Sequence, residues 1–173
     1  MATRIDLSKL SLMDALDLAK LIEMEACHRY QMFARQFGHS GGDDAGSFFE
    51  MMARNEAKHG QELEERRAAL FGNAPATVSL DDLYDVEAPD MGAPHRGMSV
   101  VEAFEIGLAA EQKAYDFYDS ALPGITDPEV RELFVELRDE EVEHVEMLKA
   151  AKTKLPASAD EEAEYDLDET PYL

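Results

Sequence analysis

The sequence contains the motif Glu-x-x-His twice, once as Glu56 with His59 and once as Glu141 with His144. A spacing of three residues places two side chains on the same face of a helix, one turn apart, so each motif brings a carboxylate and an imidazole together. Both groups are common metal ligands. A single copy in a Glu-rich chain would be equally typical of a solvated charged face, so the surroundings of each motif decide its meaning.

Both motifs lie inside an apolar stripe of helical period. Around the second motif the stripe continues in steps of four and three through Val130, Phe134, Leu137, Leu148, Ala151 and Leu155. Phe49, Met52, Leu63 and Leu70 continue it around the first motif. This pattern is typical of the core-facing side of a bundle helix and predicts that both motifs are buried. Because an unpaired ionised carboxylate is costly to bury, we expect a cation to neutralise them.

Two further stripes each carry a single carboxylate at their middle. The pattern Glu-x-x-Ala-x-x-x-Tyr runs from Glu23 to Tyr30 and again from Glu111 to Tyr118. Each copy precedes one Glu-x-x-His motif, so the chain is an internal repeat of a helix pair. The two tyrosine hydroxyls could hydrogen-bond ligand carboxylates across the bundle or relay electrons; simple packing of the rings in the core is the alternative.

A glutamate from each of two helices and a Glu-x-x-His from each of two others resembles the ligand set of ferritin-like carboxylate proteins, which hold two metal ions. Over roughly residues 10–155 the chain resembles the rubrerythrin and bacterioferritin branch of that superfamily. The resemblance implies an all-α, ferritin-like four-helix bundle of two antiparallel helix pairs joined by a long crossover. It also implies Glu23 and Glu111 as terminal ligands, Glu56 and Glu141 as bridging ligands, and His59 and His144 as ligands of one ion each.

The sequence departs from the rubrerythrin pattern in two respects. Rubrerythrins usually carry a small iron domain with four cysteines, whereas Cys27 is the single cysteine here. They also carry a further glutamate one turn before the ligand of the third helix, where this chain has Leu108. The first departure argues against a self-sufficient peroxidase, and the second makes the expected centre more similar to the symmetric bacterioferritin type.

Composition limits the remaining possibilities. A length of 173 residues, 45% of them hydrophobic, predicts one domain with a filled core. A single cysteine forms no intrachain disulfide, which favours a reducing cytoplasm, and no apolar run is long enough for a signal peptide or a membrane span. The net charge of -22 disfavours nucleic acid and anionic membranes as partners and attracts metal cations.

Capping and turn residues divide the chain into four predicted helices at about 11–37, 43–71, 99–122 and 127–155. Ser11, position 43 or 44, Ser99 and the stretch 126–129 supply the expected starts. Residues 72–98, rich in proline and glycine, are expected to form the crossover, with short helical turns at 79–83. His39 and His95 fall in loops and are expected to be solvated. The bundle domain thus covers 1–156 and is followed by an acidic tail, 157–173.

The tail contains seven acidic residues and no basic one, a composition typical of disorder. Its apolar residues, such as Tyr165, Leu167 and Tyr172, could anchor it on a neighbouring subunit or dock it on another protein, and the sequence leaves both open. A homodimer or a larger homo-oligomer is expected from the family resemblance alone.

Oxygen and nitrogen ligands without thiolate suit two iron ions, or two manganese ions, better than zinc. Four carboxylates neutralise two divalent cations, and open coordination positions admit oxygen or hydrogen peroxide. We therefore expect a di-iron oxidoreductase that oxidises ferrous iron with oxygen or peroxide, acting as a ferroxidase or a peroxide scavenger. The sequence does not identify an electron donor.

Three alternatives remain open at this stage. The protein could bind or store iron without significant turnover, or it could be a dimanganese catalase. It could also be a metal-free helical interaction protein whose buried acids are protonated or salt-bridged. Several acids next to the motifs, including Glu62, Glu140 and Glu143, lie off the core-facing stripe and are expected to be exposed, although one could line an access path for ions.

Overall fold

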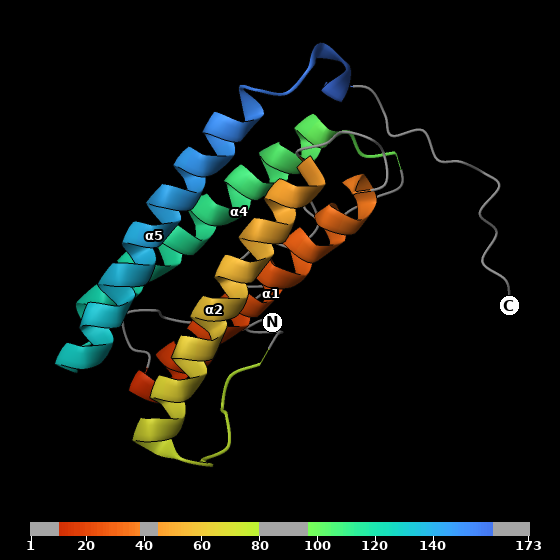
Figure 1. The fold of residues 1–173 in the computed structure, drawn as a ribbon. Helices are drawn as coiled ribbons and strands as arrows, with labels where there is room; N and C mark the ends of the chain where they lie inside the picture. The colour runs from red at the N-terminus through yellow and green to blue at the C-terminus, as the bar shows by residue number, and fades with distance from the viewer. Residues whose placement is uncertain (1–10, 39–44, 80–96, 161–173) are drawn as a thin grey trace, which may run out of the picture.

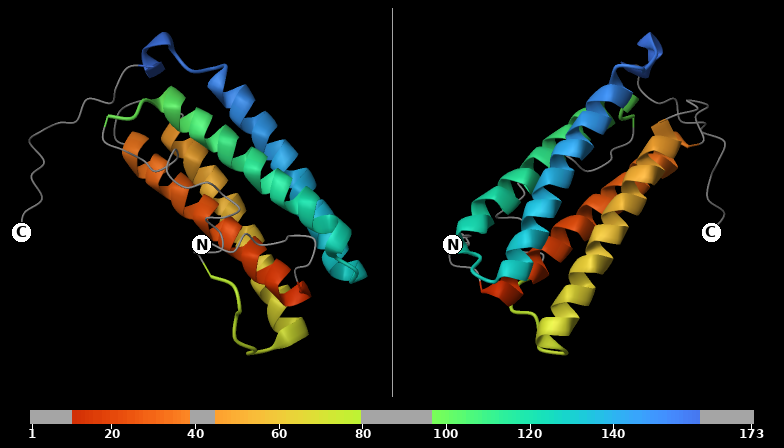
Figure 2. Two further views of the ribbon diagram at one scale, coloured as in Figure 1. Left: turned by 180° about the vertical axis from the view of Figure 1, so that it is seen from behind. Right: turned by 60° about the vertical axis from the view of Figure 1, so that its left-hand side comes forward.

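The computed structural model describes residues 11–38, 45–79 and 97–160. These ranges contain four long helices and no strand: α1 (Leu12–Phe37), α2 (Ala45–Phe71), α4 (Val100–Ala121) and α5 (Pro128–Lys152). Two antiparallel pairs, α1 with α2 and α4 with α5, pack against each other (Figure 1), and the two further views in Figure 2 show the same arrangement. The predicted all-α bundle is confirmed.

Local capping explains where the first pair begins and ends. The Ser11 side chain accepts a hydrogen bond from the backbone N–H of Asp14 at 3.1 Å and caps α1. At the end of α2, Gly72 has a φ of 56°, a left-handed conformation that glycine adopts without a steric penalty. The caps expected for α2 at positions 43 and 44 lie outside the described residues.

The second pair starts with two side-chain caps. Ser99 and Glu102 form a capping box at the start of α4, each accepting a hydrogen bond from the other's backbone N–H, at 3.1 and 2.8 Å. The Asp127 side chain caps α5, and Pro128 occupies its first turn, where a missing N–H costs nothing. The short 3-10 helix η2 (Leu122–Gly124) joins the two.

The helix α5 ends at Lys152, three residues before the expected position 155. Beyond it, the backbone N–H groups of Lys154 and Leu155 donate to carbonyls three residues earlier, at 3.0 and 3.2 Å. This tighter turn ends the helix ahead of Pro156. The chain then forms the short helix η3 (Ala157–Asp160), and the rest of the predicted acidic tail lies outside the described residues.

The segment between α2 and α4 leaves the first helix pair at one end of the bundle and enters the second pair at the other. Figure 1 shows α2 ending at one end, whereas α4 begins at the other. Neighbouring helices of the two pairs consequently run antiparallel, which brings the middle of each helix to the same level. Residues 80–96 of the predicted crossover, with most of the helical turns expected at 79–83, lie outside the described residues.

Two apolar clusters fill the core, one toward each end of the bundle. The first includes Leu16, Ile22, Leu63, Phe117 and Phe134, and the second includes Phe33, Phe49, Met52, Phe104 and Leu148. Each of the four helices contributes residues to both clusters. Along every helix, the buried glutamate or Glu-x-x-His pair lies between its residues of the first cluster and its residues of the second. The predicted polar residues therefore lie in the middle of the bundle, between the two apolar clusters.

A buried ion pair joins α1 to the end of α2. The Arg67 guanidinium donates to the Asp17 carboxylate through Nε at 2.8 Å and through Nη2 at 3.2 Å. It also donates to the backbone carbonyls of Gly72, at 3.1 Å, and Ala74, at 2.7 Å. Both side chains are buried, and the two carbonyls that accept these hydrogen bonds belong to the residues that directly follow α2.

No helix in the described ranges is long and apolar enough to cross a membrane.

Candidate metal centre

The six predicted ligand residues meet at the middle of the bundle. Each helix contributes one or two of them: Glu23 from α1, Glu56 and His59 from α2, Glu111 from α4, and Glu141 and His144 from α5. None of the six is more than 5% exposed. Because the first and second hairpins carry the same sequence pattern, each places one glutamate and one Glu-x-x-His pair on its inner face.

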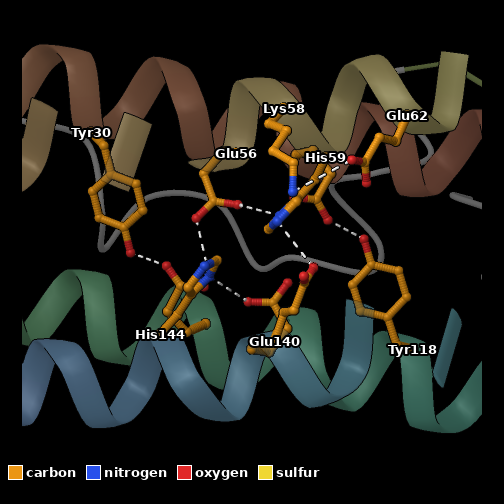
Figure 3. Close-up of polar contacts among 11 residues, drawn as sticks. Tyr30, Glu56, Lys58, His59, Glu62, Tyr118, Glu140 and His144 are labelled. Carbon is orange, nitrogen blue, oxygen red and sulfur yellow. Dashed lines mark hydrogen bonds and ion pairs between the residues drawn. The ribbon is translucent and has the colours of Figure 1, made fainter. Parts of the chain in front are cut away.

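The imidazole of His59 faces carboxylates of its own helix pair. Its Nδ1 atom lies 3.4 Å from Oε2 of Glu23 and 3.6 Å from Oε2 of Glu56. The other carboxylate oxygen of Glu56 lies 3.2 Å from Nδ1 of His144. Glu56 thus spans the two histidines (Figure 3), the position that a bridging carboxylate needs.

The imidazole of His144 is surrounded by three carboxylates. Its Nδ1 atom lies 3.2 Å from Glu56, 3.3 Å from Glu141 and 3.4 Å from Glu111. One N–H group cannot satisfy three carboxylates at once. The two imidazole rings stack with their centroids 5.6 Å apart. Two groups of potential ligand atoms result, Glu56–His59–His144 and Glu111–Glu141–His144, and within each group the atoms lie within 4.8 Å of one another.

Tyr30 and Tyr118 lie at the two ends of the centre and reach across it (Figure 3). The Tyr30 hydroxyl, on α1, donates to Glu111 on α4, and the Tyr118 hydroxyl, on α4, donates to Glu23 on α1. Both tyrosines are fully buried, and burial is the main cause that raises the pKa of each hydroxyl well above its usual range. Each hydroxyl therefore keeps its proton and holds one glutamate of the opposite hairpin in place.

One contact at the centre involves a residue that sequence reasoning placed in solvent. The carboxylate of Glu140, on α5, lies 3.0 Å from Nε2 of His59, and its side chain is 40% exposed (Figure 3). A carboxylate at this nitrogen favours the proton on Nε2 and leaves the Nδ1 lone pair facing Glu23 and Glu56. The available signal was its position directly before Glu141; the first motif has Asn55 at the corresponding place.

The charges of the centre shift the pKa values of its members in opposite directions. Burial, followed by repulsion from Glu111, raises the pKa of Glu56 well above its usual range, and burial together with Glu111 does the same for Glu141. Burial acts to lower the pKa of His59 and His144, but neighbouring carboxylates, chiefly Glu23 and Glu111 respectively, outweigh it and raise both values. In metal-free protein these shifts favour the protonated forms of Glu56, Glu141 and both histidines.

The pKa of Glu111 is shifted the other way. Burial acts to raise it, but hydrogen bonds with His144 and Glu141 outweigh burial and lower the pKa below its usual value. A protonated neighbour thus stabilises this one carboxylate. Protons on these groups and a metal cation would neutralise the same buried negative charge, so the two would compete.

The unsatisfied atoms of the centre test whether these residues fit a metal. Four buried polar atoms in it make no hydrogen bond within the described structure: Glu23 Oε2, Glu56 Oε1, His59 Nδ1 and Glu141 Oε2. Buried polar atoms are usually satisfied, and these four are oxygen and nitrogen donors of the kind that iron and manganese accept. Two divalent cations would also balance four carboxylates. The residue types, the burial and the missing partners therefore fit a two-metal site.

Four antiparallel helices around a buried set of four glutamates and two histidines define the class of ferritin-like carboxylate bundles. Comparison with known families agrees with this assignment. The family model described as rubrerythrin matches residues 14–152, and the chain belongs to the rubrerythrin family. Among curated proteins, no sequence matches this chain significantly.

Solved structures show the same fold. An uncharacterised conserved protein from Magnetospirillum magnetotacticum MS-1 is 29% identical; the match covers 85% of this chain and 97% of that one, with a TM-score of 0.70. A hypothetical protein from Pyrococcus furiosus is 19% identical, with coverage of 83% and 89% and a TM-score of 0.66, and this likeness concerns the fold alone.

Proposed function

We propose that this protein binds two iron ions at the centre and oxidises ferrous iron, with oxygen or hydrogen peroxide as the electron acceptor. The observation that supports the proposal most strongly is the group of four buried, unsatisfied ligand atoms on Glu23, Glu56, His59 and Glu141. Glu23 and Glu111 would be terminal ligands, Glu56 and Glu141 bridging ligands, and the two histidines would each bind one ion through Nδ1. The placement of Glu56 between both imidazoles supports its bridging role.

The residues around the ligands would prepare them for this role. The Glu140 carboxylate, 3.0 Å from Nε2 of His59, would accept a hydrogen bond from an Nε2–H group, which would orient the ring and direct the Nδ1 lone pair inward. Tyr30 and Tyr118 hold one oxygen each of Glu111 and Glu23, and the second oxygen of each carboxylate faces a histidine of the centre, at 3.4 Å from His144 and from His59 respectively. When bound, two ferrous ions would together supply two electrons to one oxidant molecule. The apolar clusters on both sides keep bulk water away from the site.

Metal content and ferrous oxidation test the proposal directly. Protein purified without added metal is analysed for bound metals, loaded anaerobically with ferrous iron, and then exposed to oxygen or to hydrogen peroxide. We expect about two iron ions per chain, as in related two-metal bundles, and rapid oxidation. Glu56→Ala and Glu141→Ala should lose both properties, whereas Glu143→Ala, an exposed residue on α5, should keep them.

The other functions considered from the sequence give different results in this experiment. Stoichiometric manganese together with oxygen release from peroxide would identify a dimanganese catalase. Iron that binds but is oxidised no faster than free ferrous iron would indicate binding or storage without turnover. A chain that binds no metal, with Glu56→Ala and Glu141→Ala indistinguishable from it, would contradict the proposal.

A further inference from the structure

A groove on the outer face of the α1–α2 pair leads to the centre. It has a volume of about 350 Å³, and Met24, Cys27, His28, Glu56, Ala57 and Gly60 are among the residues that line it. Glu56 is 1% exposed and belongs to the centre, whereas Met24 and His28 are exposed. The groove therefore reaches from the protein surface to a residue of the proposed metal site.

Small side chains open this face, and the internal repeat shows what larger ones would do. Cys27 follows Glu23 by four positions, and Ala57 and Gly60 follow Glu56 by one and by four. At the corresponding positions after Glu111 and Glu141, the second half of the chain has Tyr115, Val142 and Val145. All three are larger than their counterparts. Beside the proposed ligands, the first helix pair therefore has smaller side chains than the second pair has at the corresponding positions.

Gly60 lines the groove directly beside two proposed ligands. It directly follows His59, and a Cβ atom placed on it would lie 3.7 Å from Cβ of Glu23, which is ordinary van der Waals contact. A methyl group would therefore fit without a clash, while the branched side chain of valine would extend into the space of the groove. Glycine is a poor helix former, and its presence in the middle of α2 matches the position of the opening.

The chemistry of the lining favours an uncharged, partly apolar molecule over a metal cation. Glu56 is the single carboxylate among the lining residues, which also include Lys20 and His28. Met24, which is 53% exposed, together with Cys27 and Ala57 provides apolar surface. The volume is also roughly ten times the 30 Å³ that one water molecule occupies in the liquid, so the groove has room for an oxidant larger than hydrogen peroxide.

We propose that this groove binds organic hydroperoxides, with the peroxide group toward Glu56 and the organic group on Met24, Cys27 and Ala57. The inference rests on the proposed function, because the two ferrous ions of the centre are the reductant. The hydroperoxide takes one electron from each ferrous ion and two protons from solvent; its O–O bond breaks, and it leaves as one alcohol and one water. Two ferric ions remain.

Binding to the metal-free protein is the first test, and it requires no turnover. Cumyl alcohol, the product that cumene hydroperoxide would give, is titrated into the protein, and binding is followed by ligand-observed NMR. We expect Gly60→Val to weaken binding about tenfold or more, which corresponds to about 1.4 kcal/mol. Ala57→Val, a second variant at the mouth, should weaken it in the same direction. Val145→Ala, at the repeat position of Gly60, is the matched control and should bind the alcohol as the parent does.

Oxidation of the ferrous-loaded protein is the second test. Cumene hydroperoxide should oxidise Gly60→Val about tenfold more slowly than the parent, while hydrogen peroxide, which needs little room, should oxidise both at similar rates. Absence of alcohol binding to the parent, or equal binding to the parent and Gly60→Val, overturns the inference. A parent that binds the alcohol but takes up no iron instead overturns the proposed function and with it the redox step, so the two failures are distinguishable.

Discussion

The bundle contains two buried charged clusters, and they differ in how their charges are satisfied. Arg67 meets Asp17 through two hydrogen bonds and two backbone carbonyls through two more, so this cluster is complete within the protein. At the centre, four carboxylates share two imidazoles, and four ligand atoms have no hydrogen-bond partner. Both clusters are buried, so the difference in hydrogen bonding distinguishes a structural ion pair from a candidate metal site.

The largest effect should come from breaking the complete cluster. Asp17→Asn leaves the Arg67 guanidinium without its counter-charge in a largely enclosed position, and removal of one partner of such an ion pair is destabilising. We expect a loss of stability clearly larger than that of the control below, measured by urea unfolding of the metal-free protein, with metal content unchanged. Glu129→Gln removes the exposed partner of Arg66 and serves as the control, with an expected loss of about 1 kcal/mol or less. Equal effects in both variants would contradict this reading.

The second effect concerns Glu140, a partly exposed carboxylate beside the centre. Glu140→Gln replaces the carboxylate beside His59 Nε2 by a neutral amide, and loss of such a supporting carboxylate typically lowers metal affinity about 10–100-fold, or about 1.4–2.7 kcal/mol. Competition with a chelator measures the affinity. Because the contact is to His59, one of the two metal ions should be lost more easily than the other. Glu143→Gln, two positions from Glu141 and exposed, should leave the affinity unchanged.

The third prediction is that one substitution at Glu56 raises the stability of the metal-free protein and lowers its metal binding. Glu56→Gln replaces a buried carboxylate by a neutral group of the same shape. Burial and repulsion raise the pKa of Glu56, and each unit of such a shift corresponds to about 1.4 kcal/mol of destabilisation near neutral pH. We expect the metal-free variant to be about 1–2 kcal/mol more stable than the parent in urea unfolding, and its metal content to fall. A less stable metal-free variant would show that Glu56 is already satisfied without metal.

The smallest effect is a pH dependence of the metal-free protein. The folded-state pKa values of Glu56, Glu141, His59 and His144 are raised, so their stabilising contributions are present at low pH and are lost as pH rises. For the glutamates the loss begins above the unfolded value of about 4.3, and for the histidines above about 6.5. The lowered pKa of Glu111 acts below pH 4.3 and does not counter this trend.

Between pH 5 and pH 8, the free energy of unfolding of the metal-free protein should therefore fall by about 1 kcal/mol or more. With saturating ferrous iron under anaerobic conditions, stabilisation by the metal should instead grow over the same range, because the ligands must be deprotonated to bind it. Thermal unfolding with and without metal at several pH values measures both trends. Parallel curves would show that metal and protons do not compete for the same residues.

The sequence predicted the parts of the fold and the site that depend on local patterns. Steps of three and four residues placed Glu23, Glu111 and both Glu-x-x-His motifs on core-facing stripes, and the structure has all six side chains buried. Caps such as Ser11 and Ser99 marked helix starts to within a residue. The end of α5 was predicted three residues too late, because a 3-10 turn continues the same apolar spacing after the α-helix has ended.

Side-chain contacts between different helices were harder to predict from the sequence than the helices themselves. Glu140 looked exposed by its position on α5, yet its carboxylate reaches His59 on α2. Asp17 and Arg67 lie on different helices, fifty residues apart, and neither falls in a recognisable motif. The sequence left open whether Tyr30 and Tyr118 form cross-bundle hydrogen bonds, relay electrons or simply pack in the core, and the structure shows the hydrogen bonds.

By itself, the sequence determined the all-helical fold, the internal repeat and the set of buried carboxylates and imidazoles, because helical period and burial are properties of a single segment and its nearest neighbours. The tertiary structure alone decided which atoms meet: Glu56 between two histidines, Glu140 against one of them, and an open groove on the α1–α2 face. These features depend on how far apart two packed helices lie and how each is rotated about its axis. Side chains from all four helices determine those distances and rotations together, so no single segment encodes them.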